Sequence, residues 1–216
     1  QTFLSALRRW VGRYGLDALA WSFYGTPDAL HARVDHPAAF PLLAMLHHLI
    51  RSNGCHRVIE TGTARGVSAA CLASAVAHHA DAQVVTLDGW GYPERETLWA
   101  ALPAEVRRVI EPRQVDVFAG LQTALDRRET FHAALLDTEH TAEHVLKEFA
   151  LATQLVCPGG LILIHDAILE TGTVERALGE ISRQGYGVVR LWTAEGGDRP
   201  DAGLGLAVIE NRRRTV

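Results

Sequence analysis

The chain contains little cysteine. Three cysteines occur among its 216 residues, Cys55, Cys71 and Cys157, with no Cys-x-x-Cys pair. An odd and scattered set argues against a disulfide framework and against a zinc site, since both need thiols in suitable pairs. We therefore expect a protein of a reducing, cytoplasmic compartment.

Long apolar runs and an excess of positive charge are also missing. No apolar stretch reaches the roughly 20 residues that a membrane-spanning helix needs. The formal net charge is −4, whereas nucleic-acid binding requires a basic surface. We expect neither nucleic acid nor a membrane as a partner. The first residue is Gln1 rather than Met, so we expect the true start of the protein to lie upstream.

Internal repeats and low-complexity linkers are absent as well. The composition, 48% hydrophobic and 21% charged over 216 residues, suits a single globular domain with a full core. Short apolar segments predict seven strands: Arg57–Thr61, Gln83–Asp88, Val115–Ala119, Ala133–Asp137, Leu161–His165, Gly187–Trp192 and Leu204–Ile209. Longer amphipathic segments predict helices: Pro41–Ile50, Ser68–His79, Thr141–Leu155 and Thr173–Gln184.

Strands alternating with helices of this length predict an α/β fold, with a doubly wound, mostly parallel seven-stranded sheet over residues 54–216. The last two strands are close in sequence, so we expect one of them to run antiparallel at the sheet edge. Residues 1–53 are predicted to form an N-terminal helical extension that packs against the sheet. The alternatives are a lid or substrate wall, with Tyr24–His36 as the substrate contact, or the surface of a homodimer.

A glycine turn follows the first predicted strand, in the segment Glu60-Thr61-Gly62-Thr63-Ala64-Arg65-Gly66. Glycines let the backbone approach a ligand closely, and the first N–H groups of the next helix are free to bind an anionic group. A dinucleotide fingerprint would need a glycine at Ala64. The spacing therefore favours another adenosyl cofactor over NAD(P). An ordinary glycine turn without a ligand is the alternative.

Polar side chains end four of the predicted strands, namely Glu60, Asp88, Asp137 and the pair His165-Asp166. Ligands of parallel sheets bind beyond the carboxyl ends of the strands, so these residues predict a site at that rim. A carboxylate at Asp88 suits the two hydroxyls of a ribose. A turn or helix-cap role for Asp88 is the alternative.

His140 follows Asp137 by three residues and is a candidate general base, because histidine titrates near neutral pH. The alternative for His140 is a place beside the N-cap of the following helix. Asp137 and Asp166 offer oxygen ligands for Mg²⁺, whereas His165 is a softer ligand that suits Mn, Fe or Zn. The His165-Asp166 pair is also able to act in acid–base chemistry without a metal.

These landmarks resemble those of a known family. Glu60–Gly66 resembles motif I of class I S-adenosylmethionine-dependent methyltransferases, and Asp88-Gly89-Trp90 resembles the D-x-W of a small-molecule branch. Asp137–His140 is similar to the D-G-x-H of sugar- and antibiotic-tailoring enzymes and to the D-x-x-K of catechol-type O-methyltransferases. Gly120-Leu121-Gln122 departs from the family's Gly-Asp-Ser, because the acid that contacts the adenine is absent.

The resemblance implies a Rossmann-like methyltransferase fold and S-adenosylmethionine as cofactor, with Mg or Mn as a further candidate. The catalytic residues it implies are Asp137, His140 and His165, and the metal ligands it implies are Asp137, His165 and Asp166. The cofactor contacts it implies are Glu60, Gly62, Thr63, Ala64, Gly66, Ser68, Asp88, Trp90, Gly120, Leu121 and Asp137.

The implied activity is methyl transfer to a hydroxyl of a small molecule, such as a sugar, a phenol or a natural product, with metal assistance. A nitrogen acceptor is an alternative. Two other classes of protein stay open, namely an NAD(P)-binding Rossmann-type oxidoreductase and a non-catalytic protein that binds an adenosyl ligand. The glycine spacing argues against the first class. The histidines and aspartates at the rim argue against the second.

Overall fold

A computed structural model describes residues 39–167, 173–192 and 205–212 of the chain. The predicted substrate contact at Tyr24–His36 lies outside the described residues. The described strands are β1 (Arg57–Thr61), β2 (Gln83–Asp88), β3 (Ile110–Gln114), β4 (Phe131–Leu136), β5 (Val156–His165), β6 (Val188–Trp192) and β7 (Gly205–Glu210).

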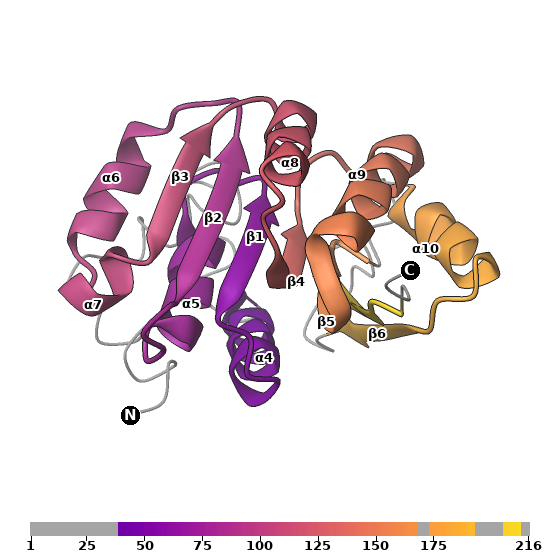
Figure 1. Cartoon of the computed structure of the whole chain (residues 1–216), viewed down its shortest axis with the longest axis horizontal. Helices are drawn as coiled ribbons and strands as arrows, with labels where there is room; N and C mark the ends of the chain where they lie inside the picture. Colours follow the sequence, from indigo (N-terminus) through magenta and orange to yellow (C-terminus); the bar gives the residue numbers. More distant parts are fainter. Residues whose placement is uncertain (1–38, 168–172, 193–204, 213–216) are drawn as a thin grey trace, which may run out of the picture.

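The strands form one seven-stranded sheet in the order β3-β2-β1-β4-β5-β7-β6 (Figure 1). The pairs from β3 through to β5 are parallel. β7 is antiparallel to both of its neighbours, β5 and β6. The mostly parallel α/β sheet predicted from the sequence is confirmed.

Helices cover both faces of this sheet. They are α4 (Ala39–Ser52), α5 (Val67–Val76), α6 (Pro93–Ala100), α7 (Ala104–Arg107), α8 (Val117–Asp126), α9 (Ala142–Leu155) and α10 (Val174–Arg183). One hydrophobic core lies between the sheet and α4, α5 and α6, and a second lies between the sheet and α8, α9 and α10. In β1, Val58 belongs to the first core and Ile59 to the second, because successive side chains of a strand point to opposite faces.

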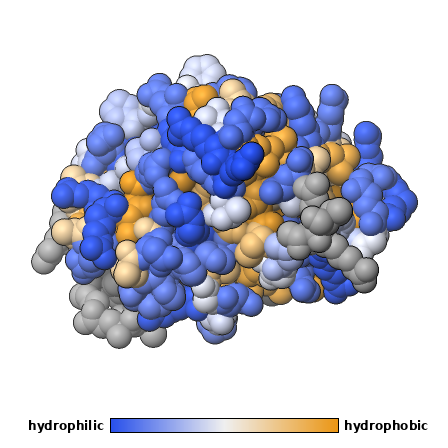
Figure 2. Space-filling view, in the orientation of Figure 1, coloured by the Kyte–Doolittle hydropathy of each residue, from blue (hydrophilic) through white to orange (hydrophobic). Residues whose placement is uncertain are grey.

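Hydrophilic side chains cover most of the face shown in Figure 2, with hydrophobic side chains visible between them. Among the described residues, Trp90 and Val189 are the large hydrophobic residues that remain exposed. None of the described helices combines the length and the apolar character that crossing a bilayer requires.

Helix α4 lies within the predicted N-terminal extension but contributes to the first core. Its Leu43, Leu46 and Ile50 are at most 4% exposed. The helix predicted at Pro41–Ile50 is thus confirmed. The division into an extension of residues 1–53 and a domain of residues 54–216 stays a prediction.

The third strand was predicted in the wrong place. Residues 115–119 do not form a strand, because Asp116 caps α8 by accepting a hydrogen bond from the N–H of Ala119 at 3.0 Å. The true third strand, β3, contains Pro112 and has no fully buried side chain. Proline is tolerated at a sheet edge, where an N–H donor is not needed. An edge strand of this kind lacks the apolar run that marked the others.

The antiparallel strand also lies elsewhere than expected. β7 is inserted between β5 and β6, one place inside the edge, and β6 takes the edge. The side chains of Leu206, Ala207 and Ile209 in β7 are at most 1% exposed, whereas Val189 of β6 is 58% exposed. The more deeply buried strand therefore occupies the position that has a neighbour on both sides.

Two further element boundaries differ from the prediction by three residues or more. The helix predicted at Ser68–His79 ends at Val76. β5 begins at Val156 instead of Leu161, because Pro158-Gly159-Gly160 continues the strand through a register shift against β4. The N–H of Gly159 donates to the carbonyl of Asn211 at 2.8 Å, so this irregular stretch is held by the residue that follows β7.

Candidate functional site

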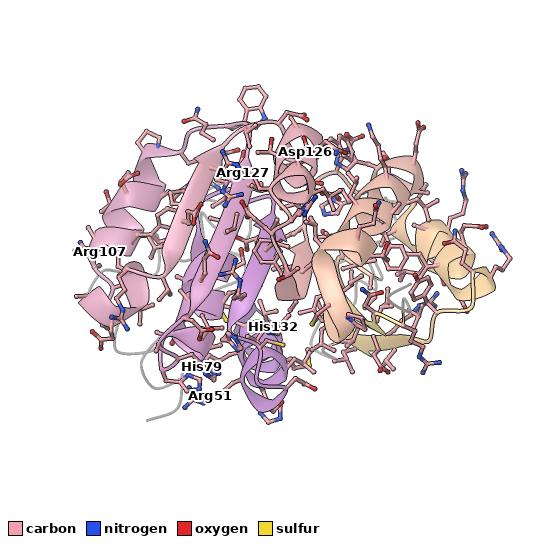
Figure 3. All side chains as sticks on the ribbon, viewed as in Figure 1. Arg51, His79, Arg107, Asp126, Arg127 and His132 are labelled. Carbon is pink, nitrogen blue, oxygen red and sulfur yellow. The ribbon has the colours of Figure 1, made fainter. Side chains whose placement is uncertain are left out.

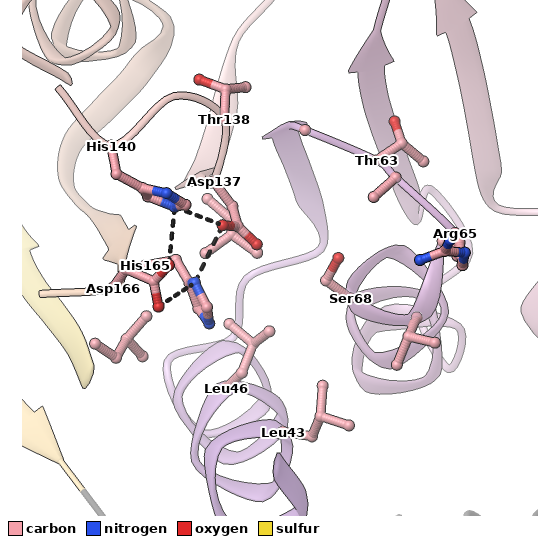
Figure 4. Close-up of a pocket in the computed structure, with 16 residues that line it drawn as sticks. Leu43, Leu46, Thr63, Arg65, Ser68, Asp137, Thr138, His140, His165 and Asp166 are labelled. Carbon is pink, nitrogen blue, oxygen red and sulfur yellow. Dashed lines mark ion pairs between the residues drawn. The ribbon is translucent and has the colours of Figure 1, made fainter. Parts of the chain in front are cut away.

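A cavity of about 240 Å³ lies beyond the carboxyl ends of β1, β4 and β5 (Figure 4). The glycine turn, the loops after β4 and β5, α4 and β7 all contribute to its wall. Its lining residues are Leu43, Leu46, Gly62, Thr63, Ala64, Arg65, Gly66, Val67, Ser68, Leu135, Asp137, Thr138, His140, His165, Asp166 and Leu206. The glycine turn and most of the polar rim residues predicted from the sequence therefore meet in one place.

The glycine turn needs its two glycines for reasons internal to the protein. Gly62 and Gly66 have φ values of +82° and +80°, which side chains rarely adopt. A Cβ at Gly62 would stand 1.8 Å from the carbonyl oxygen of Asp137, and one at Gly66 would stand 2.6 Å from Nε1 of Trp99. Helix α5 begins at Val67 without a side-chain cap, so its first N–H groups are left for a ligand beside the cavity.

Asp88 has the turn-stabilising contacts that the sequence offered as its alternative role. Its Oδ2 accepts a hydrogen bond from the N–H of Ala64, and its Oδ1 accepts one from the N–H of Trp90, both at 2.7 Å. Neither Asp88 nor Trp90 lines the cavity formed by the described residues. The Trp90 side chain is 76% exposed.

Gly120 and Leu121 were expected just after a strand, but they lie inside α8. Leu121 is fully buried in the second core, and a Cβ at Gly120 would stand 2.9 Å from the side chains of Leu87 and Val115. The structure does not bring either residue to the cavity. Their role as cofactor contacts stays a prediction.

Glu60 ends β1 beneath the glycine turn and is fully buried. The hydroxyl of Thr86 donates to Oε2 of Glu60, and the hydroxyls of Thr86 and Thr63 are 2.6 Å apart. Burial raises the pKa of the Glu60 carboxyl to about 7. Glu60 is therefore linked through Thr86 to Thr63, which lines the cavity.

Four side chains form a compact cluster, the His/Asp cluster, on the other side of the cavity (Figure 4). One ligand atom from each of Asp137, His140, His165 and Asp166 lies within 4.8 Å of the others. His140 Nε2 is 2.9 Å from Oδ2 of Asp166 and 3.7 Å from Oδ1 of Asp137. His165 Nδ1 is 3.1 Å from a carboxylate oxygen of both aspartates. Asp166 has a φ of +52°, an uncommon backbone conformation that aspartate tolerates better than most residues.

The four groups of the His/Asp cluster change one another's protonation. Contacts with Asp137 and Asp166 raise the pKa of His140 to about 9, more than burial lowers it. Burial lowers the pKa of His165 as well, but the two aspartates raise it well above its usual value. Burial raises the pKa values of Asp137 and Asp166, but the histidines hold both below their usual range. The cluster therefore pairs two carboxylates with two protonated histidines at neutral pH.

The donors of the His/Asp cluster fit a divalent cation. Imidazole and carboxylate ligands together suit Mn, Fe or Zn, whereas Mg²⁺ prefers oxygen ligands. His140 Nε2 and His165 Nδ1 are buried and make no aligned hydrogen bond to the described residues, although carboxylate oxygens lie close by. Without a cation, the protonated histidines balance the negative charge of the two carboxylates. A divalent cation would supply that positive charge in their place. Within the described ranges, no other set of His, Cys, Asp and Glu gathers its ligand atoms in this way.

A buried glutamate that the sequence analysis missed lies behind the loop that carries His140. Glu148 of α9 is 1% exposed, and burial raises the pKa of its carboxyl to about 7. His144 lies between two acids, with Nδ1 3.3 Å from Glu139 and Nε2 3.9 Å from Glu148. The spacing of His144 and Glu148 by four residues on one helix was a local signal for this contact.

Further histidines gather at the opposite end of the sheet. The rings of His56, just before β1, and His132, in β4, have centroids 3.9 Å apart, and His79 lies 5.1 Å from His56. Figure 3 shows His79 and His132 at the lower end of the strands in that view, where β1 and β4 begin. Because this group lies at the amino ends of the strands, we assign it no part in the cavity.

Comparison with known proteins identifies the fold and the family. A family model described as "Methyltransferase domain" matches residues 59–167, about half of the chain. The O-methyltransferase TomG from Streptomyces achromogenes, involved in tomaymycin synthesis and solved with SAM, is 21% identical. That alignment covers 95% of this chain and 96% of TomG, with a TM-score of 0.66.

Two other solved structures share the fold. An O-methyltransferase from Bacillus cereus in complex with SAH is 18% identical over 90% of this chain and 97% of its own, with a TM-score of 0.64. The N-methyltransferase NodS from Bradyrhizobium japonicum WM9 in complex with SAH is 17% identical over 99% of this chain and 100% of its own, with a TM-score of 0.60. A search of curated proteins gave no significant match.

Proposed function

The chain belongs to the methyltransferase-domain family, and we propose that it transfers the methyl group of S-adenosylmethionine to a hydroxyl of a small molecule. The cavity is the observation that supports this function most. One of its walls is a glycine turn before an uncapped helix, and another is a cluster of groups able to hold and move a proton. Two proteins of the same fold, TomG and the Bacillus cereus O-methyltransferase, were solved with SAM and SAH.

We assign the cofactor to the glycine-turn side of the cavity. The turn Gly62–Gly66 and Ser68 would lie against the methionine part, with the free N–H groups of α5 facing its carboxylate. A carboxylate accepts about four hydrogen bonds, so Asp88 keeps lone pairs for the ribose beside the two that Ala64 and Trp90 use. Trp90, Gly120 and Leu121 remain the proposed contacts of the adenine.

We assign the acceptor to the side of the His/Asp cluster. S-adenosylmethionine supplies a methyl group on sulfur, and an oxygen lone pair of the acceptor forms the new carbon–oxygen bond as the carbon–sulfur bond breaks. His140 takes the acceptor's proton, and the carboxylates of Asp137 and Asp166, which lie beside its Nε2, stabilise the imidazolium that forms. The products are a methyl ether and S-adenosylhomocysteine. The contribution of the protein is alignment and proton removal.

We further propose that Asp137, His165 and Asp166 hold a divalent cation. Such a cation, when bound, lowers the pKa of an acceptor hydroxyl and fixes its position. It would also lower the pKa of His140, which must be neutral to act as a base. With only the two aspartates beside it, His140 keeps its proton at neutral pH, since its pKa is raised to about 9. Competing positive charge at Asp137 and Asp166 would weaken that hold. Without a metal, the His165-Asp166 pair is left for acid–base work.

The test is a parallel calorimetric titration with S-adenosylmethionine and NAD, followed by an assay of S-adenosylhomocysteine release with sugars, phenols and amines as acceptors. We expect the protein to bind S-adenosylmethionine and not NAD, and to release S-adenosylhomocysteine with a hydroxylated acceptor. Binding of NAD in its place would support an oxidoreductase. Tight binding of S-adenosylmethionine without transfer to any acceptor would support a non-catalytic binding protein, and turnover restricted to amines would make the enzyme an N-methyltransferase.

We propose a cytoplasmic location from the state of the cysteines. Cys55, Cys71 and Cys157 are all free thiols, and the first two are buried. Unpaired thiols are the rule in a reducing cytoplasm, so we place the enzyme there.

A further inference from the structure

One buried arginine joins the two turns that border the proposed cofactor site. Arg95 lies in α6 and is 7% exposed. Its Nε donates to the carbonyl of Ala64 at 3.0 Å, and its Nη2 donates to the carbonyl of Trp90 at 2.9 Å. Ala64 belongs to the turn after β1 and Trp90 to the turn after β2. A single side chain therefore spans both.

Arg95 and Asp88 act on the same two residues from opposite sides. Asp88 accepts hydrogen bonds from the N–H groups of Ala64 and Trp90, and Arg95 donates hydrogen bonds to the carbonyls of the same two residues. The two side chains also face each other, with Nη2 of Arg95 3.6 Å from Oδ2 of Asp88 and both side chains 8% exposed. The Asp88 carboxylate, which we assign to the ribose, is thus buried beside the Arg95 guanidinium.

Ala64 needs this support because its backbone conformation is unfavourable. Its φ is +42°, and a residue with a Cβ seldom adopts a positive φ. Such a conformation persists where the surroundings impose it. Here the N–H is fixed by Asp88 and the carbonyl by Arg95, so both peptide groups that flank the strained residue are held.

Two aromatic rings hold the guanidinium in turn. Its central carbon lies 5.7 Å from the ring centre of Tyr92 and 5.8 Å from that of Trp99, both on or next to α6. Planar guanidinium groups interact favourably with aromatic faces. Trp99 also donates its indole N–H to the carbonyl of Gly66 at 2.9 Å. Helix α6 therefore contacts the glycine turn at two points, through Arg95 and through Trp99.

We propose that Arg95 is a positioning residue of the cofactor site, which holds the Gly62–Gly66 turn and Asp88 in the geometry that receives S-adenosylmethionine. The inference rests on the proposed function, because it concerns the site assigned there to that cofactor. Arg95 does not line the cavity and acts through Ala64, Trp90 and Asp88. A lysine would keep the charge but not the fork of donors that reaches two carbonyls at once.

The test compares Arg95→Lys and Arg95→Met with the wild-type chain by titration calorimetry of S-adenosylmethionine and by thermal denaturation. Arg113→Lys is the matched control, because Arg113 also makes charged contacts, to Glu111 and Glu129, but lies on the edge strand β3 away from the cavity. We expect both Arg95 variants to lose cofactor affinity by about tenfold or more, and the control to change it by less than about twofold. In turnover, Arg95→Lys should raise KM for S-adenosylmethionine more than it lowers kcat.

A rescue experiment separates positioning from general stability. Glycine adopts a positive φ without strain, so Ala64→Gly should make the turn less dependent on Arg95. Arg95→Met should therefore cost less cofactor affinity in the Ala64→Gly background than in the wild type. We expect the fold-loss to be smaller by about threefold or more. Arg95→Lys keeps the positive charge beside Asp88 and serves as the test variant if Arg95→Met does not fold.

The outcomes distinguish this inference from the proposed function. Unchanged cofactor affinity in folded Arg95→Lys, or equal losses in Arg95→Lys and Arg113→Lys, overturns the inference and leaves the methyltransferase function standing. Failure of the wild-type chain to bind S-adenosylmethionine overturns both.

Discussion

His140 is the residue on which the proposed proton transfer depends, and His140→Gln is the variant that tests it. Glutamine is similar in size but takes up no proton at neutral pH. We expect kcat to fall by about 10²- to 10⁴-fold while affinity for S-adenosylmethionine changes by less than about threefold. The measurements are steady-state turnover and titration calorimetry. His132→Gln, at the opposite end of the sheet, should alter neither. A loss of cofactor affinity that matches the loss of turnover would remove His140 as the base.

The pH dependence of turnover follows from the same residue. Asp137 and Asp166 raise the pKa of His140 to about 9, and a base works only after it has lost its proton. In chelator, residual turnover should therefore rise with pH up to about pH 9, by about tenfold per pH unit. A profile that is already flat at neutral pH under these conditions would contradict the assignment.

Gly62 shows how tightly the glycine turn is packed, and Gly62→Ala should destabilise the protein severely. The added Cβ would meet the carbonyl of Asp137 at 1.8 Å, at a φ of +82°. We expect a loss of about 3 kcal/mol or more and a melting temperature lower by about 6 °C or more. Gly159→Ala is the control, because its φ is +80° with nothing within 4 Å of the new Cβ. Equal losses in the two variants would show that only backbone strain matters at Gly62.

Residues at strand ends were predictable, and residues buried by packing were not. Asp137, His165 and Asp166 each follow an apolar run whose end marks the rim of a parallel sheet. Arg95 and Glu148 stand in helices, where charged residues are usually exposed. Both become buried only because other elements close over them. The same reason hid Leu43 and Leu46, whose contact with the cavity comes from the placement of α4.

At the scale of elements, α9 carries a buried acid that should make the stability of the fold depend on pH. Burial raises the pKa of Glu148 to about 7 from its usual 4.5. The folded chain thus keeps this proton to a higher pH than the unfolded chain does. The stabilisation is complete below about pH 4.5 and is lost as the pH rises to about 7, with a total on the order of 3 kcal/mol.

Glu148→Gln removes this titration and is the variant to compare. The free energy of unfolding of Glu148→Gln relative to the wild type should be higher at pH 8 than at pH 5, by on the order of 3 kcal/mol. Urea denaturation at the two pH values measures it. Glu143→Gln changes an exposed glutamate of the same helix and should follow the wild type at both. A constant difference between Glu148→Gln and the wild type across this range would show that Glu148 does not titrate there.

Elements with strong apolar runs were predicted, and elements defined by capping or by their edge position were not. β1, β2 and β4 are buried on both faces, and their sequences show it directly. β3 is a half-exposed edge strand with a proline, and the apolar residues just after it belong to a helix that Asp116 starts. Apolar character marked these residues as buried but did not distinguish strand from helix over a short segment.

At the scale of the whole molecule, the His/Asp cluster links the loops after β4 and β5, so a bound cation should stabilise the fold. A cation present at about 100 times its dissociation constant adds about 2.7 kcal/mol. We expect Mn²⁺ to raise the melting temperature of chelator-treated protein by about 5 °C or more, with less effect from Mg²⁺. Asp166→Asn should reduce the shift. Full turnover in chelator, with no thermal shift from any divalent cation, would end the metal proposal and leave methyl transfer standing.

The parallel order of the sheet was predictable from the alternation of strands and helices, but the insertion of β7 was not. Sequence proximity suggested that one of the last two strands runs antiparallel at the sheet edge, whereas the antiparallel strand, β7, lies one place inside that edge. It did not say which strand would pair with β5. That choice depends on which of the two can be covered on both faces, and β7 has the more deeply buried side chains.

The insertion of β7 bears on how the molecule is made on the ribosome. Leu206 of β7 forms part of the cavity wall, and the fully buried Asn211 just after it donates from Nδ2 to the carbonyls of Thr153 and Val156. The nascent chain therefore emerges with its glycine turn and histidines long before the strand that finishes the pocket. A polypeptide released prematurely, ahead of β7, would carry the reactive groups without their enclosure.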